Sequence, residues 1–189
     1  MKFEFATTQR IIFGAGTLQQ APAVAKTMGR RGLLVTGQNL ERSAPLVAHF
    51  QEAGTEFTRF QVPSEPTLDL IRQGVELAKR DRCDWVVACG GGSALDAGKA
   101  ISALLTNPGD LLEYVEMIGK AKPLEKAAAP FLAIDSGPRE TVLYQNRSFH
   151  SPLRVHDAPF GAFGVLQRRT WCSRGLRRVR FSIRNRPLG

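Results

Sequence analysis

The residues best suited to hold an anion are three consecutive glycines and a serine: Gly90, Gly91, Gly92 and Ser93. Glycine has no Cβ, so the backbone N–H groups of such a loop can approach a bound group closely. Ser93 adds a hydroxyl at the expected N-cap of a helix, where unpaired N–H groups and the positive end of the helix dipole attract negative charge. We expect a pyrophosphate to suit this chemistry best.

A run of glycines alone is weak evidence for such a site. A tight turn from a strand into a helix also needs glycine, and an isolated glycine run favours this simpler interpretation. The sequence matches neither GxGxxG nor the Walker motif, because Lys99 falls well inside the following helix rather than directly before a serine or threonine. The elements around the run must therefore decide between the two interpretations.

The glycine run lies among segments whose hydrophobic patterns alternate. Short apolar runs are typical of strands covered on both faces, and apolar residues three or four positions apart are typical of helices. The patterns predict strands at residues 3–5, 10–16, 32–37, 56–60, 84–89 and 131–134. They predict helices at residues 18–28, 43–52 with Ser43 as N-cap, 67–80 and 94–105, and a short helix within residues 107–116.

This alternation predicts an α/β fold in which a parallel sheet is wrapped by helices. Parallel strands need crossover connections, and the helices of these crossovers cover both faces of the sheet. Ligands of such folds bind beyond the carboxyl ends of the strands. Because the glycine run directly follows the strand predicted at residues 84–89, we expect it to lie at that edge.

Composition predicts a soluble globular protein. The chain has 189 residues, of which 43% are hydrophobic and 23% charged, enough for one core. No apolar run approaches the roughly 20 residues that cross a bilayer, and the first residues lack the apolar part of a secretory signal, so we expect no membrane segment and a cytoplasmic location. The three cysteines show neither disulfide nor zinc spacing, and we expect Cys83 and Cys89 to be buried thiols.

The net charge of +9 is concentrated in the last third of the chain. Residues 1–134 carry 15 lysines and arginines against 14 acidic residues, whereas residues 135–189 carry 11 arginines, no lysine and 3 acidic residues. The apolar periodicity also becomes difficult to follow after Ile134. We therefore predict a boundary near residue 134, followed by an irregular arginine-rich tail.

Five separated segments occur in an order that resembles a known family. They are IIFGAGT, GLLVTG, PSEPT, DWVVAC and GGGSALDAGKA. Over about residues 3–134 the chain resembles the N-terminal nucleotide-binding domain of the iron-containing alcohol dehydrogenases, the family that also includes glycerol dehydrogenase and lactaldehyde reductase. The resemblance implies a Rossmann-like, dehydroquinate-synthase-like domain of an NAD(P)-dependent oxidoreductase that moves hydride between an alcohol and a carbonyl.

The family pattern also implies which residues contact the cofactor. The loop from Gly90 to Ser93 would hold the pyrophosphate. Asp96 and Lys99 match the acid and the lysine of the motif, although a structural role, with Asp96 in the first turn of the helix, is equally open. Pro66 and Thr67 match a loop near the cofactor, and Pro66 could equally serve only to form a turn.

The preference between NAD and NADP depends on the end of the strand predicted at residues 32–37. The family often has an acid there that would bond the ribose 2′-hydroxyl and repel a 2′-phosphate. Here the position is Gly37, followed by Gln38 and Asn39, whose side chains could bond either cofactor. Gly37 could also simply end the strand, so both cofactors stay open.

The resemblance ends after Ile134. The family would continue with a Thr-Thr-Ala-Gly-Thr-Gly-Ser-Glu segment and a helical domain that supplies an aspartate and three histidines to a divalent iron, whereas this sequence reads DSGPRETVLYQ. His150 and His156 stand in the unmatched tail, too few for a metal site. We assign no catalytic residue and no metal ligand, and expect an incomplete domain at residues 1–134 that lacks activity alone.

A change of reading frame would explain both the lost resemblance and the excess of arginine. Degenerate codons for residues 135–139, read one nucleotide later, permit Thr-Ala-Gly-Pro-Gly, which is close to the family segment. The same shift at residues 156–164 permits Met-Met-Pro-Arg-Leu-Ala-Leu, which resembles a later family stretch. We hypothesise that residues from about 135 onward are translated out of frame; an early stop in the shifted frame of the coding DNA would contradict this.

A second function class stays open for the tail. Its last residues, SRGLRRVRFSIRNRPLG, could bind nucleic acid nonspecifically through phosphates, with Trp171 and Phe181 available for stacking. Nucleic-acid binding that is lost on deletion of residues 170–189, without a response to NAD(H), would favour this alternative. The identity of the alcohol or aldehyde and the formation of a homo-oligomer also stay open.

Overall fold

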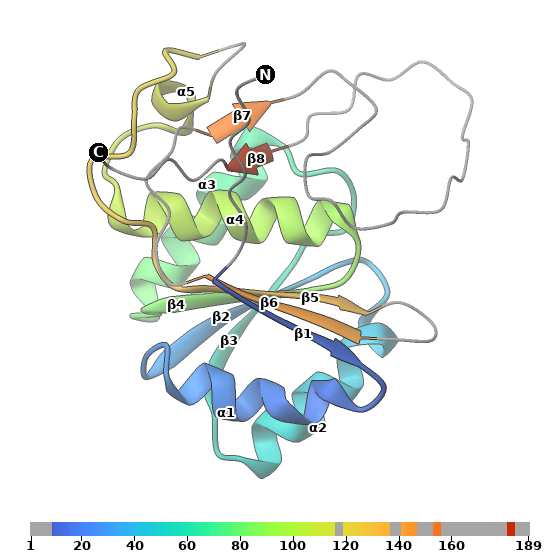
Figure 1. The fold of residues 1–189 in the computed structure, drawn as a ribbon. Helices are drawn as coiled ribbons and strands as arrows, with labels where there is room; N and C mark the ends of the chain where they lie inside the picture. The colour runs from blue at the N-terminus through green and yellow to red at the C-terminus, as the bar shows by residue number, and fades with distance from the viewer. Residues whose placement is uncertain (1–8, 116–118, 137–140, 147–152, 156–180, 184–189) are drawn as a thin grey trace, which may run out of the picture.

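A single mixed sheet organises the molecule (Figure 1). The computed structural model describes residues 9–115, 119–136, 141–146, 153–155 and 181–183. Six strands pair in the order β1-β6-β5-β4-β2-β3. Neighbours β5, β4, β2 and β3 are parallel, whereas β6 is antiparallel to both β5 and β1, so that five strands run in one direction. The strands are Arg10–Gly14 (β1), Arg31–Thr36 (β2), Glu56–Gln61 (β3), Trp85–Cys89 (β4), Phe131–Ser136 (β5) and Thr141–Asn146 (β6).

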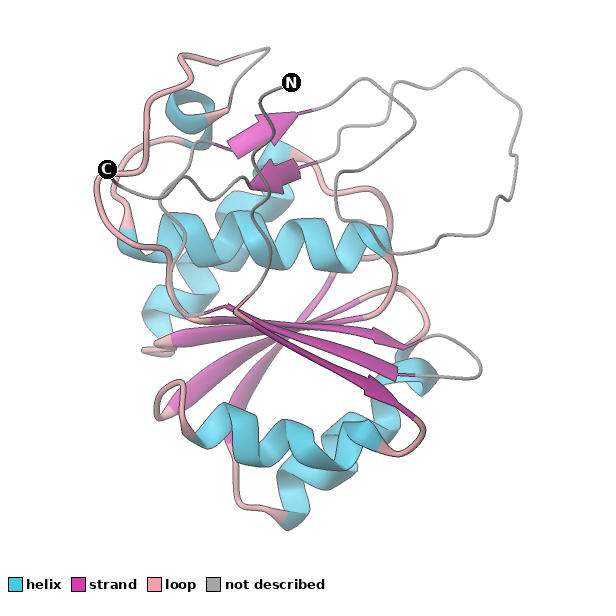
Figure 2. Ribbon diagram, viewed as in Figure 1, coloured by secondary structure: helices cyan, strands magenta, loops and turns pink. Residues whose placement is uncertain are grey.

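Helices cover both faces of this sheet, as Figure 2 shows, and the predicted α/β class is confirmed. One face carries α1 and α2, and the other carries α3, α4 and α5. The helices are Ala21–Lys26 (α1), Ala44–Glu52 (α2), Leu68–Arg80 (α3), Gly92–Thr106 (α4) and Leu111–Tyr114 (α5), with 3₁₀ turns at Thr17–Gln20 (η1) and Leu40–Ser43 (η2). Two short strands, Leu153–Val155 (β7) and Phe181–Ile183 (β8), pair antiparallel.

The sheet continues past the boundary predicted at residue 134. Strand β5 ends at Ser136, and β6 fills the space between β5 and β1. Its sequence TVLYQN contains three residues that favour strands, Thr141, Val142 and Tyr144, and its backbone pairs with the edges of both neighbours. Leu143 is buried in the core next to α1 and α2. The predicted strand at residues 3–5 lies outside the described residues.

Two local predictions differ from the structure. The helix predicted at residues 18–28 divides into η1 and α1. Pro22 has no N–H to donate, which would break a hydrogen bond inside one continuous helix. In the first turn of α1 that N–H would have no partner within the helix, so the proline costs nothing there. Ser43 does precede α2, but its hydroxyl donates to the Leu40 carbonyl at 2.8 Å instead of capping the helix. The predicted strands at 32–37, 56–60 and 84–89 agree with β2, β3 and β4 within one residue at each end.

Close packing of α4 on the sheet fixes the position of its first turn. Gly98 lies at the contact, and a Cβ there would lie 2.7 Å from the Cβ of Ala88 on β4 and 2.9 Å from Cε2 of Phe131 on β5. Only glycine lets the helix backbone approach this closely. The amino end of α4 is therefore held at the carboxyl edge of the sheet.

The predicted burial of two thiols is confirmed. Cys83 and Cys89 are both buried thiols, and burial raises the pKa of the Cys83 thiol above its ordinary value. No helix in the described part of the chain has the length and apolar character that crossing a membrane requires.

Candidate functional site

A cleft of about 450 Å³ lies where β2 and β4 end side by side. Thr36 and Cys89 are paired at the last positions of these parallel strands, so the loops that follow them meet. A Cβ on Gly90 would lie 3.4 Å from the backbone N of Gly37, which shows how closely the two loops approach. The volume falls within the roughly 300–1,000 Å³ of ordinary ligand pockets.

The chain connections explain why a cleft opens at this point. From β2 the chain passes through α2 on one face of the sheet to β3, whereas from β4 it passes through α4 on the opposite face to β5. The two loops therefore leave neighbouring strands in opposite directions. This is the topological switch point at which α/β folds bind ligands.

Seven of the eleven predicted site residues line this cleft: Gly37, Gln38, Asn39, Gly90, Gly91, Gly92 and Ser93. The other four, Pro66, Thr67, Asp96 and Lys99, are not among its lining residues. The structure therefore brings together the glycine loop and the end of β2, two segments more than 50 positions apart in the sequence.

The glycine run gives α4 an uncapped amino end. Gly90 has a φ of +149°, which strongly favours glycine, and its N–H donates to the Ile134 carbonyl at 3.1 Å. Gly91 is the N-cap, and in the described part of the chain no side chain caps this helix. The first bond within the helix runs from Leu95 N–H to the Gly91 carbonyl at 3.1 Å, so the N–H groups before it can face a ligand.

The predicted N-cap was therefore two residues too late. Ser93 lies inside the first turn of α4, because the backbone already becomes helical at Gly92. An anion at this end of the helix would meet glycine N–H groups first. The Ser93 hydroxyl would be a secondary contact.

The loop after β2 is held by polar contacts of its own. The Asn39 side chain accepts a hydrogen bond from the Glu41 N–H at 2.9 Å and so caps η2, and Gln61 Nε2 donates to the Gln38 carbonyl at 3.2 Å. The backbone that follows Gly37 is thereby tied to β3.

Asp96 and Lys99 form an ion pair on α4, with 3.2 Å between Lys99 Nζ and Asp96 Oδ1. Their side chains are only 15% and 10% exposed. This ion pair favours a structural role for both residues, but the predicted place of Asp96 was wrong: α4 begins at Gly92, so Asp96 lies beyond its first turn. Contact of either residue with a ligand stays a prediction.

Pro66 and Thr67 lie at the start of α3, directly after Glu65, the last residue of the loop that lines the cleft. Pro66 is buried. Thr67 is the N-cap of α3, and its Oγ1 accepts a hydrogen bond from the Leu70 N–H at 3.2 Å. Any part of these residues in ligand binding stays a prediction.

Replacing Thr67 with alanine should lower the free energy of unfolding by about 1 kcal/mol, because the Leu70 N–H loses its capping partner. Urea unfolding followed by circular dichroism measures this change. Thr67→Ser keeps the hydroxyl and should stay within a few tenths of a kcal/mol of the parent protein. An equal loss in both variants would contradict the capping role.

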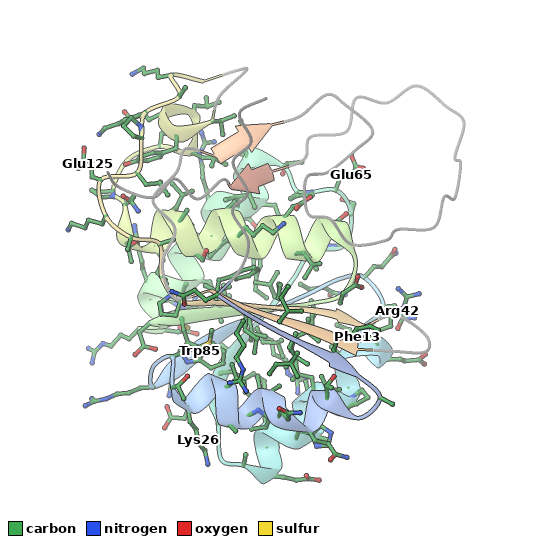
Figure 3. All side chains as sticks on the ribbon, viewed as in Figure 1. Phe13, Lys26, Arg42, Glu65, Trp85 and Glu125 are labelled. Carbon is green, nitrogen blue, oxygen red and sulfur yellow. The ribbon has the colours of Figure 1, made fainter. Side chains whose placement is uncertain are left out.

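Two charged residues at the cleft were not predicted from the sequence. Arg42 and Glu65 both line it, and Figure 3 shows them at the same edge of the molecule. Arg42 lies five positions after Gly37, but this proximity alone does not show that the chain turns there and brings Arg42 to the cleft. Burial raises the pKa of the Asp135 carboxyl on β5, and the positive charge of Arg42 opposes this rise.

The described residues contain no set of metal ligands. Nowhere among them do three or more histidine, cysteine or acidic side chains gather. His49 on α2 lies 3.7 Å from Glu52 (Nδ1 to Oε2), away from the cleft. His150 and His156 lie outside the described residues. The side chains that the structure places do not fit an iron site.

A family model for iron-containing alcohol dehydrogenases matches residues 8–136 of the chain. Among curated relatives, choline dehydrogenase of Bacillus subtilis is 34% identical over 137 residues, which cover 70% of this chain and 33% of the relative. The 1,3-propanediol dehydrogenase of Citrobacter freundii is 29% identical over 134 residues, which cover 67% of this chain and 35% of the relative. The chain thus spans about a third of the length of these relatives.

Solved structures of other proteins superpose on the fold of this chain. An NADH-dependent butanol dehydrogenase from Thermotoga maritima superposes with a TM-score of 0.60 and 28% identity, over 70% of this chain and 34% of that protein. A 1,3-propanediol oxidoreductase superposes with a TM-score of 0.63 and 27% identity, over 71% of this chain and 36% of that protein. The superposed part is comparable in extent to the sequence match.

Proposed function

The chain belongs to the iron-containing alcohol dehydrogenase family, and from this premise we propose that the cleft between β2 and β4 binds NAD or NADP for hydride transfer between an alcohol and a carbonyl compound. The observation that carries the proposal is the uncapped amino end of α4, which faces the cleft at the switch point of the sheet. A pyrophosphate is the part of a dinucleotide that such a helix end binds.

Each part of the cleft has a role in this proposal. The N–H groups of Gly91, Gly92 and Ser93 hold the pyrophosphate. Gln38 and Asn39, at the end of β2, lie beside the adenosine ribose. The bound nicotinamide supplies the hydride acceptor or donor, and the protein contributes binding and orientation.

The proposal covers the cofactor half of the reaction. We propose that the dinucleotide-binding domain, predicted at residues 1–134, also includes β6, which pairs with β1 and β5. The family name implies iron, but the described residues supply no ligands for it, and we assign them no metal-dependent step and no catalytic residue. The alcohol substrate is accordingly proposed only as a class.

Isothermal titration calorimetry of the purified chain with NADH and with NADPH tests the proposal. We expect saturable 1:1 binding of at least one cofactor, and competition by ADP. Adenosine, which lacks phosphates, should compete at least tenfold more weakly, because it makes no contact with the helix end. Absence of binding, or equal competition by adenosine and ADP, would contradict the proposal.

Nucleic-acid binding through the arginine-rich tail has no structural observation in its favour. Apart from Phe181–Ile183, the residues 173–189 lie outside the described part of the chain, as does Trp171. This alternative, the cytoplasmic location and homo-oligomer formation remain predictions from the sequence.

A further inference from the structure

Arg42 is placed to read the part of the cofactor that distinguishes NADP from NAD. It belongs to η2, the 3₁₀ turn that begins three residues after Gly37 at the carboxyl end of β2. In dinucleotide-binding folds the adenosine ribose lies at this strand end, where an acid bonds the 2′-hydroxyl of NAD or an arginine accommodates the 2′-phosphate of NADP. Arg42 is exposed and lines the cleft beside Gln38 and Asn39.

The Arg42 side chain is available for such a ligand. Within the described part of the chain it forms no ion pair or hydrogen bond, whereas Arg31 and Arg72 are each bonded to carboxylates at 2.8 Å or less. The turn that carries it is fixed, because Asn39 caps its first residues and the Ser43 hydroxyl donates to the Leu40 carbonyl at 2.8 Å. A guanidinium on a fixed backbone suits bidentate recognition of a phosphate.

The space in front of the strand end is also open. A Cβ on Gly37 would meet no heavy atom within 4 Å, and its φ is not in the region that requires glycine. Packing therefore leaves room for a Cβ and does not demand glycine here. Because the residue is glycine, no carboxylate at this position repels a 2′-phosphate.

From these observations we infer that the cleft selects the 2′-phosphorylated dinucleotide, and that Arg42 is the residue that binds its 2′-phosphate. The inference rests on the proposed function, because it presumes that the adenosine ribose lies at the end of β2. Glu65 is the acidic residue that also lines the cleft, but it comes from the loop after β3 rather than from the turn that carries Arg42. The positive charge of Arg42 lowers the pKa of the Asp135 carboxyl on β5, against the larger effect of burial, and within the described part of the chain the two side chains form no ion pair.

Calorimetry with two probes separates the phosphate from the rest of the cofactor. The probes are adenosine 2′,5′-bisphosphate and adenosine 5′-monophosphate, which differ only in the 2′-phosphate. We expect the parent chain to bind the bisphosphate at least tenfold more tightly. Arg42→Gln should weaken bisphosphate binding by about 10- to 100-fold, while binding of the monophosphate changes less than threefold. Arg42→Lys should retain part of the preference.

Arg30→Gln is the matched control. It removes the same charge from an exposed arginine that precedes β2 at the opposite edge of the sheet, and it should leave both affinities unchanged. Gly37→Asp provides a second, independent change that should weaken binding of the bisphosphate and spare the monophosphate. Circular dichroism confirms that each variant is folded.

The outcomes distinguish this inference from the proposed function. Equal binding of both probes by the parent chain, or a preference that survives Arg42→Gln, overturns the role of Arg42 while the cofactor site stands. Equal losses in Arg42→Gln and Arg30→Gln also overturn it, because the effect would then be one of net charge. Failure of both probes to bind overturns the proposed function and this inference together.

Discussion

Replacing Gly91 with aspartate should abolish dinucleotide binding without destabilising the fold. Gly91 is the N-cap of α4, its φ of −83° is accessible to any residue, and a Cβ there would meet no heavy atom within 4 Å. Aspartate is a preferred N-cap, so its carboxylate would accept hydrogen bonds from the N–H groups at the helix end. Those N–H groups would then no longer be available to the pyrophosphate, and the negative carboxylate would repel the negative pyrophosphate.

The expected loss of affinity is about 100-fold or more, because two charge-assisted hydrogen bonds together are worth about 3 kcal/mol or more. Calorimetric titration with NADPH and NADH measures it. Gly91→Ala is the control: its methyl group fits and caps nothing, so affinity should stay within about threefold of the parent. Thermal unfolding should show Gly91→Asp to be at least as stable as Gly91→Ala. Unchanged affinity in Gly91→Asp would exclude the helix end as the anion site.

Replacing Trp85 with alanine should lower the free energy of unfolding by about 3–5 kcal/mol. Trp85 is the first residue of β4 and is fully buried between the sheet and α2. Its ring meets the Phe50 ring edge-on, with centroids 6.1 Å apart. It also lies against Gly32 of β2, where a Cβ would be 2.5 Å from the indole. The neighbouring backbone cannot collapse far into the cavity that alanine would leave.

A loss of this size is a large part of the roughly 5–15 kcal/mol that stabilises an ordinary domain. Urea unfolding measures it. Trp85→Phe is the informative comparison, since the indole Nε1–H is buried with no hydrogen-bond partner in the described part of the chain. Phenylalanine keeps most of the ring contact and removes this unpaired donor, so its loss should be less than half that of alanine. Equal losses would show that the ring packing contributes little.

The fold could be predicted where side-chain patterns are strong. Strands β2 and β4 are continuous apolar runs buried on both faces, and such runs are distinctive in a sequence. Strand β6 escaped prediction because its place depends on the free edges of β5 and β1, which are distant in the sequence and supply backbone rather than side-chain partners.

The candidate site could be predicted as far as its chemistry was local. The glycine run indicates a helix end that can bind an anion, and Gly37 lies at the end of an obvious strand. The N-cap was misplaced because glycine can adopt either extended or helical backbone, so a run of three does not show where the helix begins. Arg42 was missed because its meaning depends on the turn η2, which directs it toward the cleft.

The most direct test of the central claim, that the cleft between β2 and β4 binds a dinucleotide by its pyrophosphate, is backbone amide NMR during titration with ADP. We predict saturable shifts that are largest at Gly91, Gly92 and Ser93 and extend to Gln38 and Asn39 across the cleft. Adenosine at the same concentration should leave the glycine amides in place. Shifts centred elsewhere, for example at the second hollow between α1 and α2 near Lys26 and His49, or none at all, would contradict the claim.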